Sequence, residues 1–472
     1  MMSPMARYPG PPTILTIFGA TGDLSEQKLL PSLFDLYNSG FLPSRFRVVA
    51  FSRRPFTSED FRAFAEGAIR RRRKRISRAK LGRFLAALSY EQGMFGEPAS
   101  YQNLGEALVH IDDRFGQCSN KLFYLAVPPA FYETIFENLA HSGLTIPCSD
   151  EMGWTRVLVE KPFGRDTKTA EKLDRMLGLL FKEEQIFRID HYLAKETIQN
   201  ILSFRFSNAL FEPIWNHDSI EKIEIRLFEA GGVGKRGSFY DETGALRDVG
   251  QNHLLQMLAV ITMSNIGILS ASGIQKERAR ILNVLKKPRV EEIVRGQYRG
   301  YQEEEGVSYG SKTETYFRLV TYLNDERWAR VPFILESGKG MRESTTEIVI
   351  YFKQTTTCLC PPGRESIHQN ILTFRIQPNE GISIRFWAKK TGFDFELEPK
   401  TLTFLYKTKR RDALPDAYER VLFDCIRGDQ TLFAGTDEVA AAWRFITPIL
   451  ETWGASPLRE YELGSDGPSA GE

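Results

Sequence analysis

The sequence predicts an α/β plus α+β protein with two domains: a doubly wound parallel sheet in residues 1–188 and a β+α domain with a large, mainly antiparallel sheet in residues 189–472. Two observations lead to this prediction. Short β-rich runs alternate with helical patterns up to about residue 190, which is typical of a parallel sheet. Beyond that point strands follow one another, with helical segments expected only near 191–203 and 249–263.

Composition agrees with a globular chain. Of the 472 residues, 42% are hydrophobic and 26% are charged, which excludes a disordered or collagen-like chain. The formal net charge of +2 is too small to attract nucleic acid or acidic membranes strongly, so neither is expected as a partner. No apolar run approaches the roughly 18 residues of a membrane span, and residues 1–13 lack the apolar stretch of a secretory signal. A cytoplasmic protein is predicted.

The five cysteines form no CxxC pair, and an odd number does not close into a disulfide framework. Cys358 and Cys360 alternate along a predicted strand and should share a face. Ordinary strand residues explain this pair better than metal ligands do, so no metal is expected. The cysteine pattern therefore favours a reducing compartment.

The elements of the first domain follow in chain order. Strands are predicted at 14–18, 47–51, 121–127 and 155–160, and helices at 28–37 and 131–140. The basic run from Arg70 to Arg75 lies inside a helical pattern. It could contact nucleic acid, but its place in an α/β domain favours a solvated helix face. In the second domain the predicted strands are IEKIEIRLFE, TYFRLVTYL, TEIVIYFK, ILTFRIQ and GISIRFWAK.

A glycine-containing turn, GATGDL at 19–24, follows the first strand and opens the first helix. Glycine allows a tight turn and lets backbone N–H groups approach a pyrophosphate, and the helix N-terminus favours negative charge. An ordinary strand-to-helix turn remains an alternative. At the end of the second strand, where an NAD site usually has an acidic residue, Arg53 and Arg54 occur instead. Guanidinium groups suit a 2′-phosphate, so NADP is favoured over NAD.

Two further segments offer polar side chains at predicted strand ends. Lys161 directly follows the strand 155–160, at the strand end where doubly wound sheets bind ligands, although a lysine there can also be a surface residue. On the helix predicted from 191, His191 and Lys195 would share a face near Tyr192 and could bind a phosphate. A solvated helix start is the alternative for this group.

His253 lies beside the apolar stripe of the second predicted helix. A histidine in that position is more often a core residue. Asp190 could orient it, however, because a carboxylate holds a neutral imidazole in one tautomer and stabilises its cation. The pair is therefore a candidate for general base catalysis.

Together these motifs resemble the glucose-6-phosphate dehydrogenase family over almost the whole chain. The segments that carry the resemblance are GATGDL (19–24) with Lys28, LFYLAVPPAFYE (122–133), VEKPFG (159–164), RIDHYLAKE (188–196), RDVGQNHLLQML (247–258), VPFILESGK (331–339), QPNEGI (377–382) and LPDAYERVL (414–422). RIDHYL followed by QNHLLQML, after a GxxGDL turn, is the most specific combination.

The resemblance implies a Rossmann-like first domain, a second domain for substrate binding and dimerisation, and a homodimer or homotetramer. It implies oxidation of glucose 6-phosphate at C1 by NADP, the entry step of the oxidative pentose phosphate pathway. The residues it assigns are His253 as base with Asp190 to orient it; His191, Tyr192 and Lys195 for the phosphate; Lys161, Glu229, Asp248 and Lys339 for the sugar; and Gly19, Thr21, Gly22, Asp23, Leu24, Arg53, Tyr132 and Lys161 for the cofactor.

The chain departs from the family pattern at a few positions. Glu336 and Ser344 occur where basic residues are frequent, and Arg342 could compensate for them. We expect weaker anion binding near these positions. Two alternatives follow: a dehydrogenase with broader sugar or NAD use, and a non-catalytic relative that binds nucleic acid through the arginine run.

Overall fold

The computed structural model describes residues 10–73, 75–149, 153–354, 368–406 and 415–469. The chain forms two compact units. The first comprises residues 1–164, 168–194 and 415–436, and the second comprises residues 165–167, 195–414 and 437–472. The sequence analysis placed the domain boundary between residues 188 and 189, and in the structure the chain passes from the first unit to the second between residues 194 and 195. Residues 415–436, which the sequence analysis assigned to the second domain, belong to the first unit.

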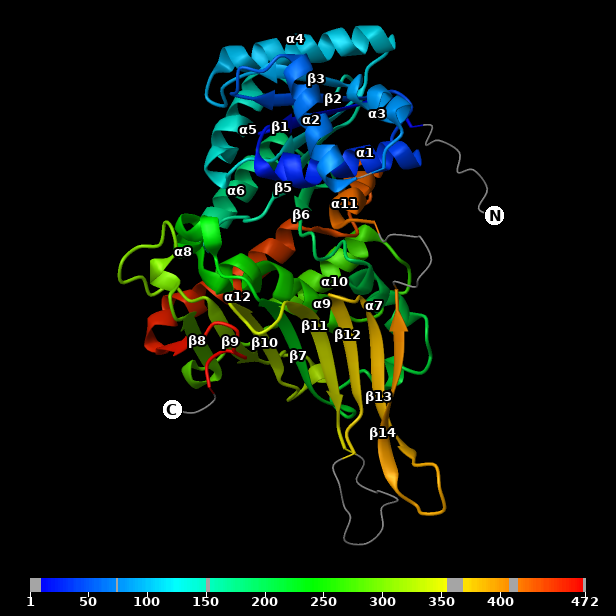
Figure 1. Cartoon of the computed structure of the whole chain (residues 1–472), viewed down its shortest axis with the longest axis vertical. Coiled ribbons are helices and arrows are strands. Elements are labelled where there is room, and N and C mark those ends of the chain that lie inside the picture. The colour runs from blue at the N-terminus through cyan, green and yellow to red at the C-terminus, as the bar shows by residue number, and fades with distance from the viewer. Residues whose placement is uncertain (1–9, 74, 150–152, 355–367, 407–414, 470–472) are drawn as a thin grey trace. The chain divides into compact units, whose positions relative to one another are not determined.

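The first unit is built on a seven-stranded sheet in the order β15-β6-β5-β4-β1-β2-β3 (Figure 1). Every neighbouring pair is parallel except β15 with β6. From β1 the chain moves outward to β3, then returns to β4 and continues to β6, which is the predicted doubly wound topology. The strands are β1 Thr13–Phe18, β2 Phe46–Ser52, β3 Leu88–Gln92, β4 Asn120–Leu125, β5 Thr155–Glu160, β6 Ile186–Ile189 and β15 Phe433–Ala434.

Helices cover this sheet, and its central strands β1 and β4 are buried along their whole length. Strands buried on both faces read as continuous apolar runs, which is why the sequence pattern located them within a residue or two. The helical segments are η1 Ser25–Leu29, α1 Leu30–Ser39, α2 Ser58–Arg72, α3 Arg78–Leu85, α4 Pro98–Phe115, η2 Pro129–Phe131, α5 Tyr132–His141, α6 Thr167–Leu180, η3 Glu183–Gln185 and α11 Ala417–Arg427.

The arginine run ends α2 and is partly used in ion pairs. Arg70 pairs with Glu66 one turn earlier on the exposed face, as a solvated helix surface would. Arg72 bonds Asp416 at 3.0 Å, and Arg73 holds Asp35 of α1 through two nitrogens at 2.7 and 2.9 Å. The sequence did not predict these pairs, which tie α2 to other segments of the same unit.

Two cysteines of the first unit are joined. Cys118, after α4, and Cys148, after α5, form a disulfide that spans 30 residues, whereas Cys425 is free and buried. The spacing in the sequence could not reveal that both loops lie at one edge of the sheet. Cys358 and Cys360, for which no metal was expected, lie outside the described residues.

The second unit contains a nine-stranded sheet in the order β14-β13-β12-β11-β7-β10-β9-β8-β16 (Figure 1). Only β7 with β10 and β8 with β16 are parallel, so the predicted mainly antiparallel sheet is confirmed. The strands are β7 Ile220–Glu229, β8 Ile293–Tyr298, β9 Tyr316–Thr321, β10 Phe333–Lys339, β11 Thr345–Phe352, β12 Ile371–Gln377, β13 Gly381–Lys389, β14 Leu397–Leu405 and β16 Leu458–Tyr461.

Helices pack on one face of this second sheet, where α7 contacts β12 and η6 contacts β7 and β10. The helical segments are α7 Glu196–Phe206, η4 Glu212–Ile214, η5 Gly234–Arg236, α8 Gly237–Ala245, η6 Leu246–Leu254, α9 Leu255–Thr262, α10 Ala271–Asn283, η7 Val290–Glu292, η8 Tyr301–Glu303, η9 Glu326–Trp328, α12 Thr436–Glu451 and η10 Trp453–Ala455. Among the described residues no helix is long and apolar enough to cross a bilayer.

Candidate functional site

The glycine turn of the first unit follows directly on β1. Gly19 has a positive φ of 77°, and a Cβ there would lie 2.4 Å from the carbonyl oxygen of Ala126. The N–H of Gly22 donates to the carbonyl oxygen of Gly19 at 2.9 Å, and the N–H of Glu26 then donates to that of Gly22 at 3.0 Å. The chain therefore turns sharply into a helix at the carboxyl edge of the sheet, as the sequence predicted. Only glycine fits the first position.

Side chains fix this turn against the end of β2. The hydroxyl groups of Thr21 and Ser52 are 2.8 Å apart and buried, and the N–H of Gly19 donates to the carbonyl oxygen of Phe51. Arg53 and Arg54 follow and are exposed, as are Gly22 and Asp23. A dinucleotide fits this arrangement, because the turn presents exposed backbone at a helix start and the guanidinium groups begin at the end of the neighbouring strand.

The end of β5 carries Lys161, which is joined to Pro162 by a cis peptide bond. Tyr132 lies in the core, and its hydroxyl donates to the carbonyl oxygen of Glu160 at 2.9 Å. The structure thus gives Tyr132 a part in holding the segment before Lys161. Glu160 itself is buried, and the Tyr124 hydroxyl donates to its carboxylate at 2.5 Å.

The burial of Glu160 changes its acidity. Loss of hydration raises the pKa of this carboxyl group to about 7, against the opposing effects of the Tyr124 hydroxyl, the Lys161 charge and the Tyr418 hydroxyl. The sequence analysis did not single out Glu160, although a carboxylate that ends the apolar strand TRVLVE was a usable signal. Tyr418 comes from α11 in the segment 415–436, and the resemblance segment LPDAYERVL (414–422) contains it without giving it a role.

The predicted helix start at 191 is wrong. Residues 191–195 form a turn, and α7 begins only at Glu196. One carboxylate oxygen of Asp190 accepts the N–H of Tyr192 at 3.0 Å, and its carbonyl oxygen accepts the N–H of Leu193 at 3.1 Å. An aspartate that bonds the backbone two residues on favours a turn over a helix. His191 and Lys195 therefore do not share a helix face.

Around that turn the first unit brings several of its predicted residues to one edge of the sheet. Gly19, Lys161 and Asp190 follow β1, β5 and β6, and parallel strands place their carboxyl ends together. The His191 ring lies parallel to the Tyr418 ring, with ring centres 6.2 Å apart, and 5.0 Å from the Tyr192 ring. Asp190 and Tyr192 are buried.

In the second unit Asp248 and His253 lie on η6, which is wound as a π-helix. Backbone bonds in a π-helix run from residue i to i+5, so side chains five apart lie on the same side of the helix. Both residues are buried, and the N–H of His253 donates to the Asn252 side chain at 2.7 Å. The sequence predicted a helix here, and its π winding is what places the two side chains on one side.

Lys339 and Glu229 end two neighbouring parallel strands, β10 and β7, and are paired in register. They form an ion pair, and the Lys339 ammonium lies 5.2 Å from the centre of the Tyr240 ring. The hydroxyl of Tyr461 donates a hydrogen bond to the Lys339 carbonyl oxygen at 2.7 Å. Because η6 packs on these two strands, the predicted sugar residues of the second unit lie in one region.

Glu336 lies on the opposite face of the same sheet. It alternates with Lys339 along β10 and pairs in register with Arg226, three positions before Glu229 on β7. Tyr316 donates to its carboxylate at 2.6 Å, and Arg226 lies 3.7 Å away. Because Glu336 faces away from Lys339, the structure gives no geometric reason for it to weaken anion binding, as the sequence analysis had expected. Ser344, the second departure, accepts the N–H of Ala230 at 2.9 Å.

A surface hollow of about 580 Å³ lies in the first unit, outside these groups. It is lined by residues of α4 and the segment after α5: Gly105, Glu106, Val109, His110, Asp113, Ser142 and Leu144. None of the predicted site residues lines it. The motifs, and not this hollow, define the candidate site.

Comparison with known proteins agrees with the motifs. Residues 16–200 match the family model of the NAD binding domain of glucose-6-phosphate dehydrogenase, and residues 202–472 match that of its C-terminal domain. The glucose-6-phosphate 1-dehydrogenase of Chlamydia muridarum is 38% identical over 464 residues, which cover 94% of this chain and 90% of the relative. That of Aggregatibacter actinomycetemcomitans is 41% identical over 473 residues, with 97% and 94% covered.

Solved structures give the same result. A glucose-6-phosphate dehydrogenase in complex with its substrate glucose-6-phosphate superposes with a TM-score of 0.91 and 31% identity, over 99% of this chain and 97% of that one. The glucose-6-phosphate 1-dehydrogenase from Mycobacterium avium gives a TM-score of 0.85 and 32% identity, over 98% and 96%.

Proposed function

The chain belongs to the glucose-6-phosphate dehydrogenase family, and from this premise we propose that it oxidises β-D-glucose 6-phosphate at C1 to 6-phospho-D-glucono-1,5-lactone. Family membership makes it an oxidoreductase that uses a nicotinamide dinucleotide. NADP is the proposed form of that cofactor. Residues 1–188 are proposed to bind the cofactor, and residues 189–472 are proposed to bind the sugar phosphate and to form the dimer.

One observation carries the proposal more than any other. The π-helix η6 puts His253 and Asp248 on one side and packs against the strands that end in Glu229 and Lys339. A histidine, two carboxylates and an ammonium therefore lie in one region of one unit, where His253, Asp248 and Lys339 are buried and the Glu229 side chain is 42% exposed. They supply a base and several hydrogen-bond partners for sugar hydroxyl groups.

The proposed chemistry needs a base and a hydride acceptor. His253 in its neutral form would take the proton of the C1 hydroxyl, a step worth roughly 10²–10⁴-fold in rate. A bound nicotinamide dinucleotide, proposed to be NADP, would supply the acceptor for the hydride that leaves C1. His191, Tyr192 and Lys195 are proposed to bind the phosphate, so that binding energy from a distant group orients C1. That Asp190 orients the base stays a prediction of the sequence, as does the cytoplasmic location.

Turnover of glucose 6-phosphate with NADP, followed by absorbance of the reduced nicotinamide, tests the function. His253→Asn should lower kcat by roughly 10²–10⁴-fold with little change in KM. His217→Asn is the matched control, because His217 lies in the same unit, is partly exposed and pairs with Asp218. A folded wild type that does not turn over glucose 6-phosphate would refute the function. A preference for free glucose would refute the phosphate assignment.

Cofactor choice is tested at the end of β2. Replacing Arg53 and Arg54 by alanine removes two guanidinium groups, and a hydrogen bond to a charged group contributes about 1.5–3 kcal/mol. We expect kcat/KM for NADP to fall about 10- to 100-fold while that for NAD stays the same. Arg47→Ala, near the opposite end of the strand, is the control. An equal loss for both cofactors would contradict the NADP assignment.

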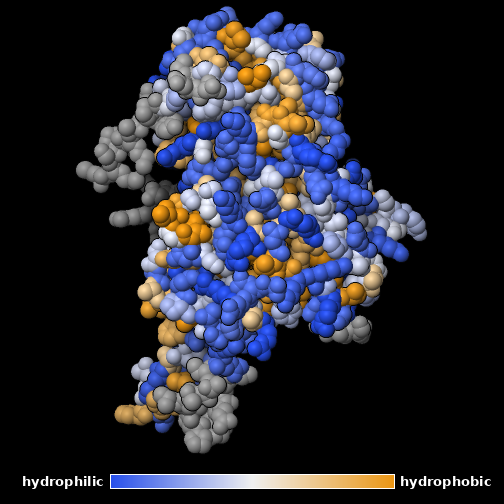
Figure 2. All heavy atoms as spheres, turned by 180° about the vertical axis from the view of Figure 1, so that it is seen from behind, coloured by the Kyte–Doolittle hydropathy of each residue, from blue (hydrophilic) through white to orange (hydrophobic). Residues whose placement is uncertain are grey.

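A second copy of the chain is the proposed partner, giving a homodimer or homotetramer. Among the described residues the edge strand β14 pairs only with β13, and it exposes Leu402, Phe404 and Leu405, at 63%, 57% and 47% of their surface. Figure 2 shows hydrophobic groups at the lower end of the molecule, where the turn between β13 and β14 lies, whereas Leu402, Phe404 and Leu405 lie toward the other end of β14. An exposed apolar edge strand is a template for pairing. Light scattering should find a smaller assembly for the double variant Leu402→Lys with Phe404→Lys. An unchanged mass would place the interface elsewhere.

A further inference from the structure

The helix that carries Asp248 and His253 is buried at both of its ends. Gly244, with a positive φ of 72°, interrupts the helical backbone near the end of α8, and helical backbone then runs from Ala245 through η6 and α9 to Thr262. The first N–H groups and the last carbonyl groups of such a helix have no partner within it. In a buried setting each of them needs one from elsewhere.

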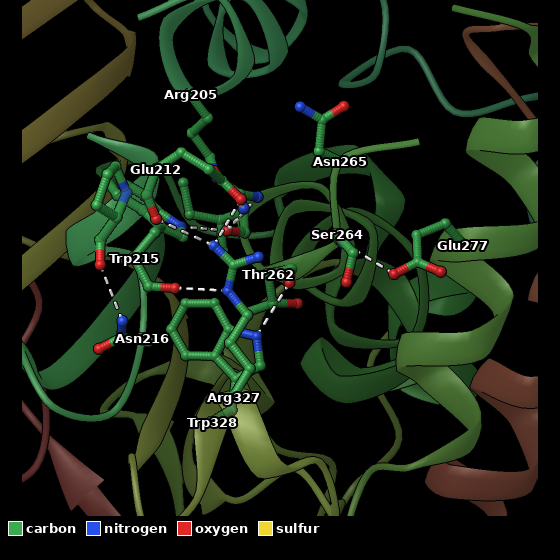
Figure 3. A network of polar contacts seen from close by, with 12 residues as sticks. Arg205, Glu212, Trp215, Asn216, Thr262, Ser264, Asn265, Glu277, Arg327 and Trp328 are labelled. Carbon is green, nitrogen blue, oxygen red and sulfur yellow. Dashed lines mark hydrogen bonds and ion pairs between the residues drawn. The ribbon is translucent and has the colours of Figure 1, made fainter. Parts of the chain in front are cut away.

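Three side chains supply the partners at the C-terminal end (Figure 3). An Arg205 nitrogen donates to the carbonyl oxygens of Ile261 at 2.9 Å and of Val260 at 3.4 Å. The indole of Trp215 donates to Ile261 at 2.8 Å, and the indole of Trp328 donates to Thr262 at 3.0 Å.

A network holds Arg205 in this place. Its guanidinium is fully buried, lies 5.2 Å from the Trp215 ring and pairs with Glu212 at 3.3 Å. Glu212 in turn accepts from Arg327 at 2.6 Å, and Arg327 also donates to the Trp215 carbonyl oxygen. Burial lowers the pKa of Arg205 to about 9, so it remains positively charged at neutral pH.

One residue supplies the partners at the N-terminal end. The carboxylate of Glu314 accepts the N–H of Leu246 at 3.0 Å, and its backbone carbonyl accepts that of Ala245 at 3.1 Å. The indole of Trp453 donates to the second carboxylate oxygen at 2.9 Å. A Cβ at position 244 would lie 2.5 Å from this carboxylate, so glycine is needed there for the approach.

The two caps match the charges of the helix. A helix carries partial positive charge at its N-terminus and partial negative charge at its C-terminus, so Glu314 and Arg205 are each at the favourable end. Arg205 lies on α7, which begins directly after Lys195, the proposed phosphate ligand. One side chain thus connects the segment proposed to bind phosphate with the helix that carries the proposed base.

We propose that Arg205 and Glu314 are positioning residues that fix the helix 246–262 along its axis and so set the place of His253 against the sugar. The proposal rests on the proposed function for its kinetic consequence. A displacement of about 1 Å at a reacting group can cost about 10²-fold in rate. We therefore expect a loss of kcat from changes at either end, although neither residue touches substrate.

Two variants test the two ends. Arg205→Lys keeps the charge but loses the forked geometry, and Glu314→Gln keeps the shape but loses the charge. Each should lower kcat about 10- to 100-fold, with KM for NADP within about twofold of the wild type. Because hydride transfer becomes slower, the primary deuterium isotope effect on kcat with C1-deuterated glucose 6-phosphate should rise.

Arg278→Lys is the matched control. Arg278 is equally buried in the same unit and pairs with Glu438 at 2.5 Å, but it lies on α10, which carries none of the proposed site residues. It should lower the melting temperature and leave kcat unchanged. Trp328→Phe, which removes one neutral N–H donor at the C-terminal end, should lower kcat less than Arg205→Lys does. If Arg205→Lys does not fold, Trp328→Phe replaces it as the test of the C-terminal end.

Amide hydrogen exchange separates this proposal from the proposed function. In both variants exchange over residues 246–262 should become faster relative to α10, whether or not glucose 6-phosphate is the substrate. If the wild type is inactive but both variants show this faster exchange, the proposed function is refuted and the proposed role of Arg205 and Glu314 is supported. Unchanged exchange, an unchanged kcat in a folded variant, or an equal loss of kcat in Arg278→Lys would overturn the proposal.

Discussion

Glu160→Gln should make the stability of the protein less sensitive to pH. Glu160 ends β5 in a fully buried position, and loss of hydration is the largest cause that raises its pKa from 4.5 to about 7. The groups that face it are the hydroxyls of Tyr124 and Tyr418, the Lys161 ammonium and the Asp190 carboxylate. Of these only Asp190 adds to the rise.

The sign follows from proton binding. Between pH 4.5 and about 7 the folded protein holds a proton on Glu160 that the unfolded chain has released. Stability therefore falls as the pH rises through this window, because the folded state binds more protons there. A difference of about 2.5 pKa units corresponds to about 3 kcal/mol, and about 2.5 kcal/mol of it falls between roughly pH 5 and pH 8. Glutamine does not titrate and removes this slope.

Urea unfolding at the two pH values measures the effect. The stability of Glu160→Gln minus that of the wild type should be about 2 to 3 kcal/mol more favourable at the higher pH. Asp60→Asn is a control of opposite sign, because hydrogen bonds from Thr57 lower the pKa of Asp60 and its contribution is lost as the pH falls. The same difference for Glu160→Gln at both pH values would refute the reasoning, since it would mean that Glu160 is ionised in the folded state throughout.

Three further predictions concern other parts of the two units. Reduction of the Cys118–Cys148 disulfide should lower the free energy of unfolding by about 3 to 4 kcal/mol, as expected for a crosslink across 30 residues. A melting temperature that does not respond to reductant in the wild type, or that still responds in Cys118→Ser, would contradict this. Glu336→Arg should leave KM for glucose 6-phosphate unchanged and destabilise the protein by about 3 to 5 kcal/mol, because it puts a guanidinium beside Arg226 and Arg318. A lower KM, measured by steady-state kinetics, would show that the face assignment is wrong. Asp35→Asn should destabilise the first unit by about 1 to 3 kcal/mol, since it leaves Arg73 without its ionised partner. Chemical denaturation compares it with Glu66→Gln, where the exposed pair with Arg70 should contribute less than about 1 kcal/mol.

The sequence was sufficient for the central strands of both sheets, because their signal is local. A strand buried on both faces, such as β4, is a continuous apolar run, and β12 alternates with period two. The predicted bounds of β5, β12 and β13 agree with the structure. The glycine turn was predictable for the same reason, because its six residues, GATGDL, stand directly between a predicted strand and a predicted helix.

Long-range pairing was not predictable from these patterns. Residues 415–436 belong to the first unit because β15 pairs with β6 across more than two hundred positions, and no feature of the segment itself indicates that partner. The turn at 191–195 was missed for a different reason. The four-residue spacing of His191 and Lys195 resembles a helix face, but the Asp190 side chain competes for the backbone N–H of Tyr192 and delays the helix to Glu196.

The sequence correctly predicted a helix in the region of η6, but it did not predict the π winding that decides which side chains share a side. In an α-helix two residues five apart point about 140° away from each other, so Asp248 and His253 would lie on different sides. The apolar stripe of α9 was visible in the sequence, but nothing in that stripe indicates an extra residue per turn. In the structure the Asn252 amide donates to the Asp248 carbonyl oxygen at 3.0 Å, and its carbonyl accepts the N–H of His253. These two bonds belong to the wider turn, so Asn252→Leu should return the segment toward α-helical winding and separate the two side chains. A variant that binds glucose 6-phosphate as the wild type does, measured by calorimetry, would contradict that account.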